Sequence, residues 1–271
     1  MKNIFSLQRV SLLFQKQWIE SKKIYLASLA VLTGLLFAIY SFKLVSYNAG
    51  DDFGLLQFST LPFRDTLLAF SALVYLSFIS GNYFYRYHAP GTGIQELILP
   101  VSASEKLTVA FLGGVFMNVV GFTLIFFSMD ALFVTVLKYL YKEVDFELLQ
   151  SKYNYFYLQQ GGFRYYWEKL DGKVITMFSV VSFLIPSIFL FGSIYFDKIS
   201  YIKTAITTVV FFLLMVSIPS FLQRVLENGK ISVVDYTEQR VFSEVIFITI
   251  LVVSILCFWG ATYHRLKEKE V

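Results

Sequence analysis

Residues 107–137 read LTVAFLGGVFMNVVGFTLIFFSMDALFVTVL, a stretch in which Asp130 is the single charged residue. A helix needs about 20 mostly apolar residues to cross the hydrocarbon core of a bilayer, and this stretch is longer than that. Its apolar residues are continuous and do not alternate with polar ones, which favours a spanning helix over a membrane strand. The stretch therefore predicts a transmembrane helix that tilts in the bilayer or extends beyond it.

Five further stretches of the same character lie on either side of this one. Hydrophobic residues make up 56% of the chain and charged residues 15%, whereas soluble domains average about 25% charged residues. We therefore expect an all-α membrane protein with a single polytopic domain over residues 1–271. The six predicted spans are residues 24–47, 66–83, 107–137, 174–196, 201–222 and 241–263.

Lysine and arginine gather at both ends of the chain, and cytoplasmic segments of membrane proteins carry an excess of these residues. The predicted first outer loop, residues 48–65, holds only Arg64 against Asp51, Asp52 and Asp65. Six spans also place both ends on one side. We therefore expect a multi-pass protein of the cell (inner) membrane with both termini in the cytoplasm. The basic residues at the ends are Lys2, Arg9, Lys16, Lys22, Lys23, Arg265, Lys267 and Lys269.

Residues 1–23 have the spacing of an amphipathic helix. Apolar or small residues recur at steps of three and four, while lysine and arginine recur at steps of seven on the opposite face. Such a helix suits the membrane surface, so we expect an interfacial helix in contact with lipid that leads into the first span. The alternative is a positively charged tail without fixed structure. The two faces are Ile4, Leu7, Ser11, Phe14 and Trp18, and Lys2, Arg9, Lys16 and Lys23.

The predicted cytoplasmic loop between the second and third spans, residues 82–106, contains two helix breaks. Proline and glycine end the second span, and a short helix can follow before the next proline. Ser102 and Glu105 then have the spacing of a capping box, which would start the third span. The loop is therefore expected to be a short structured element. The breaking residues are Pro90, Gly91, Gly93 and Pro100, and the short helix would cover residues 94–99.

Motifs for catalysis, nucleotide binding and metal binding are absent from the sequence. It contains no phosphate-binding loop, no His-Glu-x-x-His and no Gly-x-Ser-x-Gly. His88 and His264 are read as surface residues, and the net charge of +4 does not point to nucleic acid. We therefore expect no enzyme activity, no metal and no cofactor bound by this chain. The one cysteine, Cys257, excludes an internal disulfide and is expected to be a small buried apolar side chain.

Ionisable residues are missing from the middle of the predicted spans, where ion-coupled carriers usually need them. Asp130 is read as lying toward the outer end of its span, and Asn118 is expected to make an interhelical hydrogen bond. Ala30, Gly34 and Ala38 follow one another at steps of four. Small residues at this spacing let helices approach closely, either within the chain or between two copies.

The arrangement resembles the permease subunit of an ABC-2 type transporter. The likeness covers almost the whole chain, with an amphipathic N-terminal helix, six spans and a structured cytoplasmic loop after the second. Its most specific part is residues 96–106, ELILPVSASEK, because a Leu-Pro-x-Ser-x-x-Glu run often joins a coupling helix to the third span in that family. The long aromatic segment, residues 138–173, departs from the pattern of many members.

The resemblance implies that a separate ATPase subunit, which binds the ATP, docks under this loop and moves the short helix as a lever. It also implies a second permease copy or a similar chain, and export as the direction of transport. The implied docking residues are Gly93, Ile94, Glu96, Leu97, Ile98, Leu99, Pro100, Ser102 and Glu105.

Three other readings stay open. The chain could be an ion-coupled carrier or channel, an integral membrane enzyme, or a non-transporting membrane scaffold. The first lacks mid-membrane charges and the second lacks a cluster of catalytic residues near one membrane face. The substrate cannot be read from the sequence.

Overall fold

A computed structural model describes residues 5–45, 61–84, 101–140, 165–169, 172–196, 199–227 and 236–269. Every regular element in these ranges is a helix, because backbone amides and carbonyls inside a bilayer must bond within their own segment. The elements are α1 (Leu7–Val45), α3 (Leu61–Gly81), α6 (Ala103–Ala110), the π-helix η1 (Phe111–Phe116), α7 (Met117–Leu140), the 3-10 helix η3 (Tyr166–Lys169), α9 (Gly172–Tyr195), α10 (Ser200–Glu227) and α11 (Tyr236–Lys269).

Five of the helical stretches are long and apolar enough to cross a membrane. They are Leu7–Leu44, Phe63–Gly81, Ala103–Leu140, Val174–Tyr195 and Phe247–Lys269, and each contains or overlaps a predicted span. The remaining predicted span, residues 201–222, coincides with α10. Within the residues searched, its apolar stretch Ser200–Leu214 is shorter than the other five. That α10 crosses the membrane stays a prediction.

The chain divides into two compact units, which we describe separately. Unit 1 comprises Met1–Trp18, Leu76–Asn118 and Thr176–Val271, and unit 2 comprises Ile19–Tyr75 and Val119–Ile175. The expectation of a single membrane domain stays a prediction.

Helix α1 joins two segments that the sequence treats as separate. The predicted interfacial helix and the first predicted span form one continuous helix, Leu7–Val45, of 39 residues. At 1.5 Å per residue such a helix is about 58 Å long, roughly twice the thickness of the hydrocarbon core. The charged residues near its start end the apolar run without ending the helix, because lysine, arginine, glutamate and glutamine are good helix formers.

A turn of π-helix interrupts the third long helix between α6 and α7. The carbonyl of Gly114, inside this turn, accepts hydrogen bonds from Ser80 Oγ at 2.8 Å and from Asn118 Nδ2 at 2.8 Å. The expectation that Asn118 bonds to another helix is therefore wrong, since its amide donates to carbonyls of its own helix, where the wider π turn leaves them accessible. Its Oδ1 has no hydrogen-bond partner among the described residues.

In unit 2, α1 and α7 run parallel. The two helices approach closely near Gly121, where an added Cβ would lie 2.5 Å from the Tyr25 hydroxyl. Further along both helices, Phe37 packs on Phe133 with ring centroids 5.8 Å apart. Residue numbers therefore rise together along the two helices, as they must if the first and third spans cross the membrane in the same direction.

Helix α3 runs antiparallel to α7 in the same unit. Tyr75, late in α3, stacks on Phe122, early in α7, with ring centroids 6.0 Å apart. Arg64, in the first turn of α3, bonds instead to Asp130, two turns further along α7. Helices α1, α3 and α7 thus alternate in direction along the chain, as consecutive membrane spans do.

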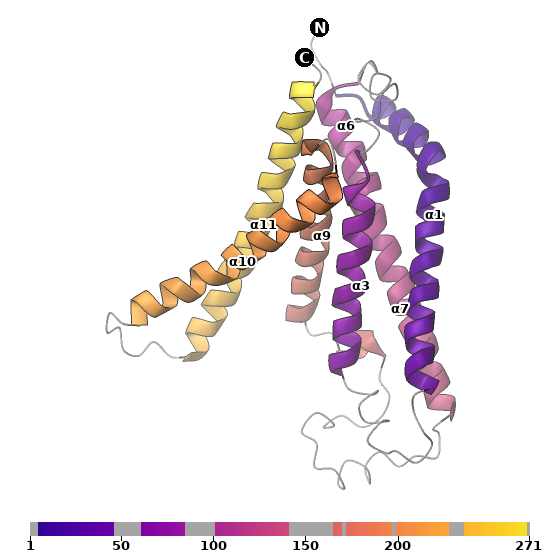
Figure 1. Cartoon of the computed structure of the whole chain (residues 1–271), viewed down its shortest axis with the longest axis vertical. Coiled ribbons are helices and arrows are strands. Elements are labelled where there is room, and N and C mark those ends of the chain that lie inside the picture. Colours follow the sequence, from indigo (N-terminus) through magenta and orange to yellow (C-terminus); the bar gives the residue numbers. More distant parts are fainter. Residues whose placement is uncertain are drawn as a thin grey trace. The chain divides into compact units, whose positions relative to one another are not determined.

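In unit 1, α9 and α11 run parallel, and α10 runs in the opposite direction (Figure 1). Ser187 accepts a hydrogen bond from the indole of Trp259 at 3.0 Å, and the Arg265 guanidinium lies over the Tyr195 ring. An added Cβ on Gly192 would lie 1.9 Å from Thr204 Oγ1, so α10 begins in close contact with the end of α9. The end of the apolar α10 stretch then packs near Leu184, earlier in α9.

Candidate functional site

Seven of the nine residues predicted to dock an ATPase lie outside the described residues. They are Gly93, Ile94, Glu96, Leu97, Ile98, Leu99 and Pro100. Ser102 and Glu105 lie within the described residues.

Ser102 and Glu105 form the predicted capping box at the start of α6. Ser102 is the N-cap residue, with φ −71° and ψ 154°. Its hydroxyl accepts a hydrogen bond from the Glu105 amide at 3.4 Å, and Glu105 Oε2 accepts one from the Ser102 amide at 2.9 Å. The box supplies acceptors for amides that the first turn of a helix otherwise leaves without partners.

The same carboxylate also binds the start of α1. Glu105 Oε1 accepts a hydrogen bond from the Ser6 amide at 2.7 Å and another from Arg9 Nε at 3.1 Å. The Glu105 side chain is fully buried, whereas that of Arg9 is 42% exposed. One buried carboxylate therefore caps α6 and holds the first residues of α1 against it. We call Ser6, Arg9, Ser102 and Glu105 the Glu105 junction.

Apolar contacts and one tyrosine reinforce the junction. Val10 and Leu13 of α1 pack in a buried cluster with Val109 of α6. The hydroxyl of Tyr83, just beyond α3, lies against Gln17 Oε1 and 3.3 Å from the carbonyl oxygen of Val109. The first three turns of α1 are thus packed on α6. Part of their apolar surface is used inside the protein and is not available for lipid.

The last turns of α11 lie at the same end of unit 1 as the junction. Phe111, directly after α6, packs on Trp259 with ring centroids 4.9 Å apart. Helix α6 itself also contacts α11. The start of α1 and the end of α11 therefore both lie beside α6 (Figure 1).

A pair of buried charges, Arg64 and Asp130, was not predicted from the sequence. Arg64, read as part of an outer loop, lies in the first turn of α3, because that helix begins at Leu61. Its Nε donates a hydrogen bond to Asp130 Oδ1 at 2.7 Å, and its Nη2 pairs with Asp130 Oδ2. The side chains are 3% and 0% exposed. Both charges are thus enclosed within unit 2.

Two tyrosines complete the surroundings of Asp130. The Tyr40 hydroxyl of α1 donates to Asp130 Oδ1 at 3.0 Å, and the Tyr166 amide of η3 donates to Oδ2 at 3.1 Å. The Tyr166 hydroxyl donates to Asp65 at 2.6 Å. Burial and the negative charge of Asp65 raise the pKa of Tyr166, so its hydroxyl stays protonated as a donor. We call Tyr40, Arg64, Asp65, Asp130 and Tyr166 the Asp130 cluster.

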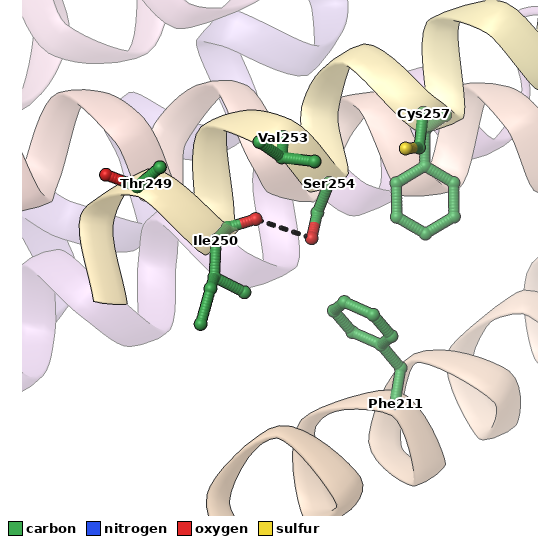
Figure 2. A pocket seen from close by; sticks show the side chains of 7 residues that line it. Phe211, Thr249, Ile250, Val253, Ser254 and Cys257 are labelled. Atoms are coloured by element: carbon green, nitrogen blue, oxygen red, sulfur yellow. Dashed lines mark hydrogen bonds between the residues drawn. The ribbon is translucent and has the colours of Figure 1, made fainter. Parts of the chain in front are cut away.

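An apolar cleft of about 400 Å³ lies between α10 and α11 in unit 1. Figure 2 shows Phe211 projecting from α10 toward the α11 residues that line the other side. Cys257 lines this cleft and is exposed, so the expectation that it is buried is wrong. Apolar composition marks a residue as fit for the bilayer, but it does not say whether the residue faces lipid or another helix.

No protein-family model, curated protein or solved structure matches the chain. Within the described ranges, no three histidine, cysteine, aspartate or glutamate side chains come close enough to hold a metal ion. Over the residues that the structure describes, the fold is that of an all-helical membrane protein, with five helices long and apolar enough to cross a bilayer.

Proposed function

We propose that the chain is the membrane-spanning permease subunit of an ABC-2 type transporter. A separate ATPase subunit would bind ATP and dock on the loop that precedes Ser102. Two permease copies, or this chain and a similar one, would form the pathway in the cell membrane. The chain ends and the docking loop would face the cytoplasm, and export would be the direction of transport.

The Glu105 junction is the observation that carries this proposal. The docking loop can transmit a displacement only if the element that follows it is fixed to the helices that must move. Glu105 caps α6, the first part of the third long helix, and also bonds to the start of α1. A displacement of the loop before Ser102 would therefore reach two membrane helices through one buried carboxylate.

The proposed second permease copy is supported by the exposed face of α1, which does not pack on the other helices that the structure describes. Ala30, Gly34 and Ala38 are all exposed, and nothing in the described structure lies within 4 Å of a Cβ added at Gly34. These small residues are therefore not used for close packing inside unit 2. They remain accessible to a helix of another copy.

The experiment is co-purification with candidate ATPase subunits in mild detergent, followed by measurement of ATP hydrolysis. Leu97→Asp, in the predicted coupling helix, is expected to lose the ATPase subunit while still inserting in the membrane. Leu140→Asp is the matched control, because Leu140 is 55% exposed at the opposite end of the same long helix that begins after the loop. If no ATPase subunit associates with the unmodified chain, or if both variants bind it equally, the coupling-loop proposal fails.

An ion-coupled carrier is the second candidate, and Asp130 is the observation that favours it. A buried carboxylate in a membrane helix is a common site for a coupling ion or proton. Here, however, both carboxylate oxygens already accept hydrogen bonds and Arg64 neutralises the charge. Transport that survives ATP depletion and stops when the ion gradient collapses would favour the carrier over the permease subunit.

A further inference from the structure

Donors from three separate segments of unit 2 converge on the carboxylate of Asp130. Oδ1 accepts from Tyr40 of α1 and from Arg64 of α3, while Oδ2 accepts from Arg64 and from the Tyr166 amide of η3. Asp130 itself belongs to α7. The cluster therefore fastens four elements of one unit to each other at a single point.

The Tyr166 ring is held from several directions. It packs on Phe126 and Phe127 with ring centroids 5.8 and 6.0 Å away, and the Arg64 guanidinium lies over it at 5.4 Å. Its hydroxyl reaches Asp65, the neighbour of Arg64. The short segment Tyr165–Lys169 is thus attached to α3 and α7 through both the main chain and the side chain of one residue.

A buried ion pair is an unusual way to join helices if its role is only structural. An apolar cluster of similar volume often stabilises a fold as well as a buried ion pair, because the pair must first give up its water. The two kinds of contact differ in the free-energy cost of opening. When the polar cluster opens, water offers new hydrogen bonds to Arg64 and Asp130 in place of the lost ones. When an apolar cluster opens, its apolar surface is exposed to water, which is unfavourable.

We propose that the Asp130 cluster is a latch that holds Tyr165–Lys169 against α1, α3 and α7 and opens when the pathway opens at this end of unit 2. The opening step rests on the proposed transport function, whereas the latch itself does not. The Asp130 cluster lies at the predicted outer ends of the spans. The closed latch therefore keeps the outer end of the pathway closed while its cytoplasmic end is open.

A reporter cysteine measures whether the latch is closed. Val134→Cys, in a Cys257→Ser background, places a thiol of nearly the same size one helical turn after Asp130, at a position that is 4% exposed. Val109→Cys places a matched thiol at a fully buried position of α6 in unit 1. The chain is reconstituted in lipid nanodiscs, and the rate of reaction with a membrane-impermeant maleimide is measured at each position.

Asp130→Asn and Tyr166→Phe are the latch variants. We expect Asp130→Asn to raise the labelling rate at position 134 by roughly tenfold or more, since it removes charge-assisted hydrogen bonds. Tyr166→Phe, which removes only the bond to Asp65, is expected to raise the rate about threefold. The rate at position 109 should not change. An unchanged rate at position 134, or an equal rise at both positions, would overturn the latch.

The opening step is tested with the ATPase subunit bound. A non-hydrolysable ATP analogue is expected to raise the labelling rate at position 134 in the chain with an intact latch. No rise in a complex that does hydrolyse ATP overturns the opening step and leaves the permease function standing. Failure to obtain any such complex overturns the permease function and the opening step together, while the nanodisc result for the latch stands alone.

Discussion

Glu105 and Asp130 are carboxylates with fully buried side chains, and each accepts hydrogen bonds from more than one segment of the chain. They differ in how far along the chain their partners lie. Glu105 has a partner three residues away in Ser102, a spacing that is recognisable in the sequence. The side chains that bind Asp130 come from positions 66 and 90 residues away. No local sequence pattern predicts such a site. Only the bond of Glu105 to Ser102 could therefore be predicted from the sequence.

The Glu105 junction leads to a prediction on stability. Every partner of Glu105 described here is a donor, so the amide of Glu105→Gln would bring its own N–H groups against another donor. We expect the free energy of unfolding to fall by about 1–3 kcal/mol. Arg9→Gln should cost about 0–1 kcal/mol, because the Arg9 side chain is 42% exposed and partly solvated. Thermal unfolding in detergent, followed by tryptophan fluorescence, gives the ranking.

Equal losses for Glu105→Gln and Arg9→Gln would contradict this assignment. They would mean that the ion pair with Arg9, and not the bonds to the amides of Ser6 and Ser102, holds the two helices together.

Among the helices, glycine positions divide into those that contact another helix and those that do not. Gly192 of α9 faces Thr204 of α10 so closely that no side chain fits between them. Gly34 of α1 faces open space in the described structure. Both lie in apolar helical stretches, so the sequence alone does not distinguish them. Close packing of small residues depends on which neighbour a helix meets.

Gly192→Ala and Gly34→Ala are therefore expected to act in opposite directions. An added methyl group at Gly192 would lie 1.9 Å from Thr204 Oγ1 and must push α10 away from α9, a cost of about 1–3 kcal/mol. At Gly34 the methyl group meets nothing, so alanine should stabilise the isolated chain by up to about 1 kcal/mol through its better helix propensity. Unfolding temperatures of the two purified variants test this difference.

A Gly192→Ala variant as stable as the unmodified chain would show that the contact between α9 and α10 is looser than described. Introducing Thr204→Gly into the Gly192→Ala variant should recover part of the lost stability if the contact is responsible.

The existence of helices was predictable from the sequence, and their ends were less so. Long apolar runs give helices in lipid because the backbone has no other donors and acceptors. Arg64 was placed in a loop because a charged residue ends a hydropathy window, although it does not end a helix. The π turn at Phe111–Phe116 and the outward face of Cys257 depend on packing against other helices. Composition carries no signal for either.

At the scale of the molecule, helix direction alternates within each unit. Helices α1, α3 and α7 alternate in unit 2, and α9, α10 and α11 alternate in unit 1. Alternation in unit 1 requires α10 to return the chain across the membrane if α9 and α11 cross it. If all six predicted spans cross, the two chain ends share one side, as their basic residues also predict.

Fusions to the C-terminus test this topology in living cells. A green fluorescent protein after residue 271 should fluoresce, and an alkaline phosphatase at the same position should be inactive, because both would be cytoplasmic. The same fusions placed after residue 140 should behave in the opposite way. An active phosphatase at the C-terminus with the expected result at residue 140 would mean that α9, α10 and α11 do not all cross the membrane.

The bond between the Ser6 amide and Glu105 joins residues 99 positions apart, and this separation has a consequence for biosynthesis. At about 5–20 residues per second, a ribosome needs roughly 5–20 seconds to reach the second partner after making the first. The first span is oriented during that interval, while Glu105 does not yet exist to neutralise Arg9. If the N-terminus is cytoplasmic, as its basic residues predict, its positive charge is still available during that interval to retain it there. The carboxylate that later binds Arg9 is made only after the first span has been oriented.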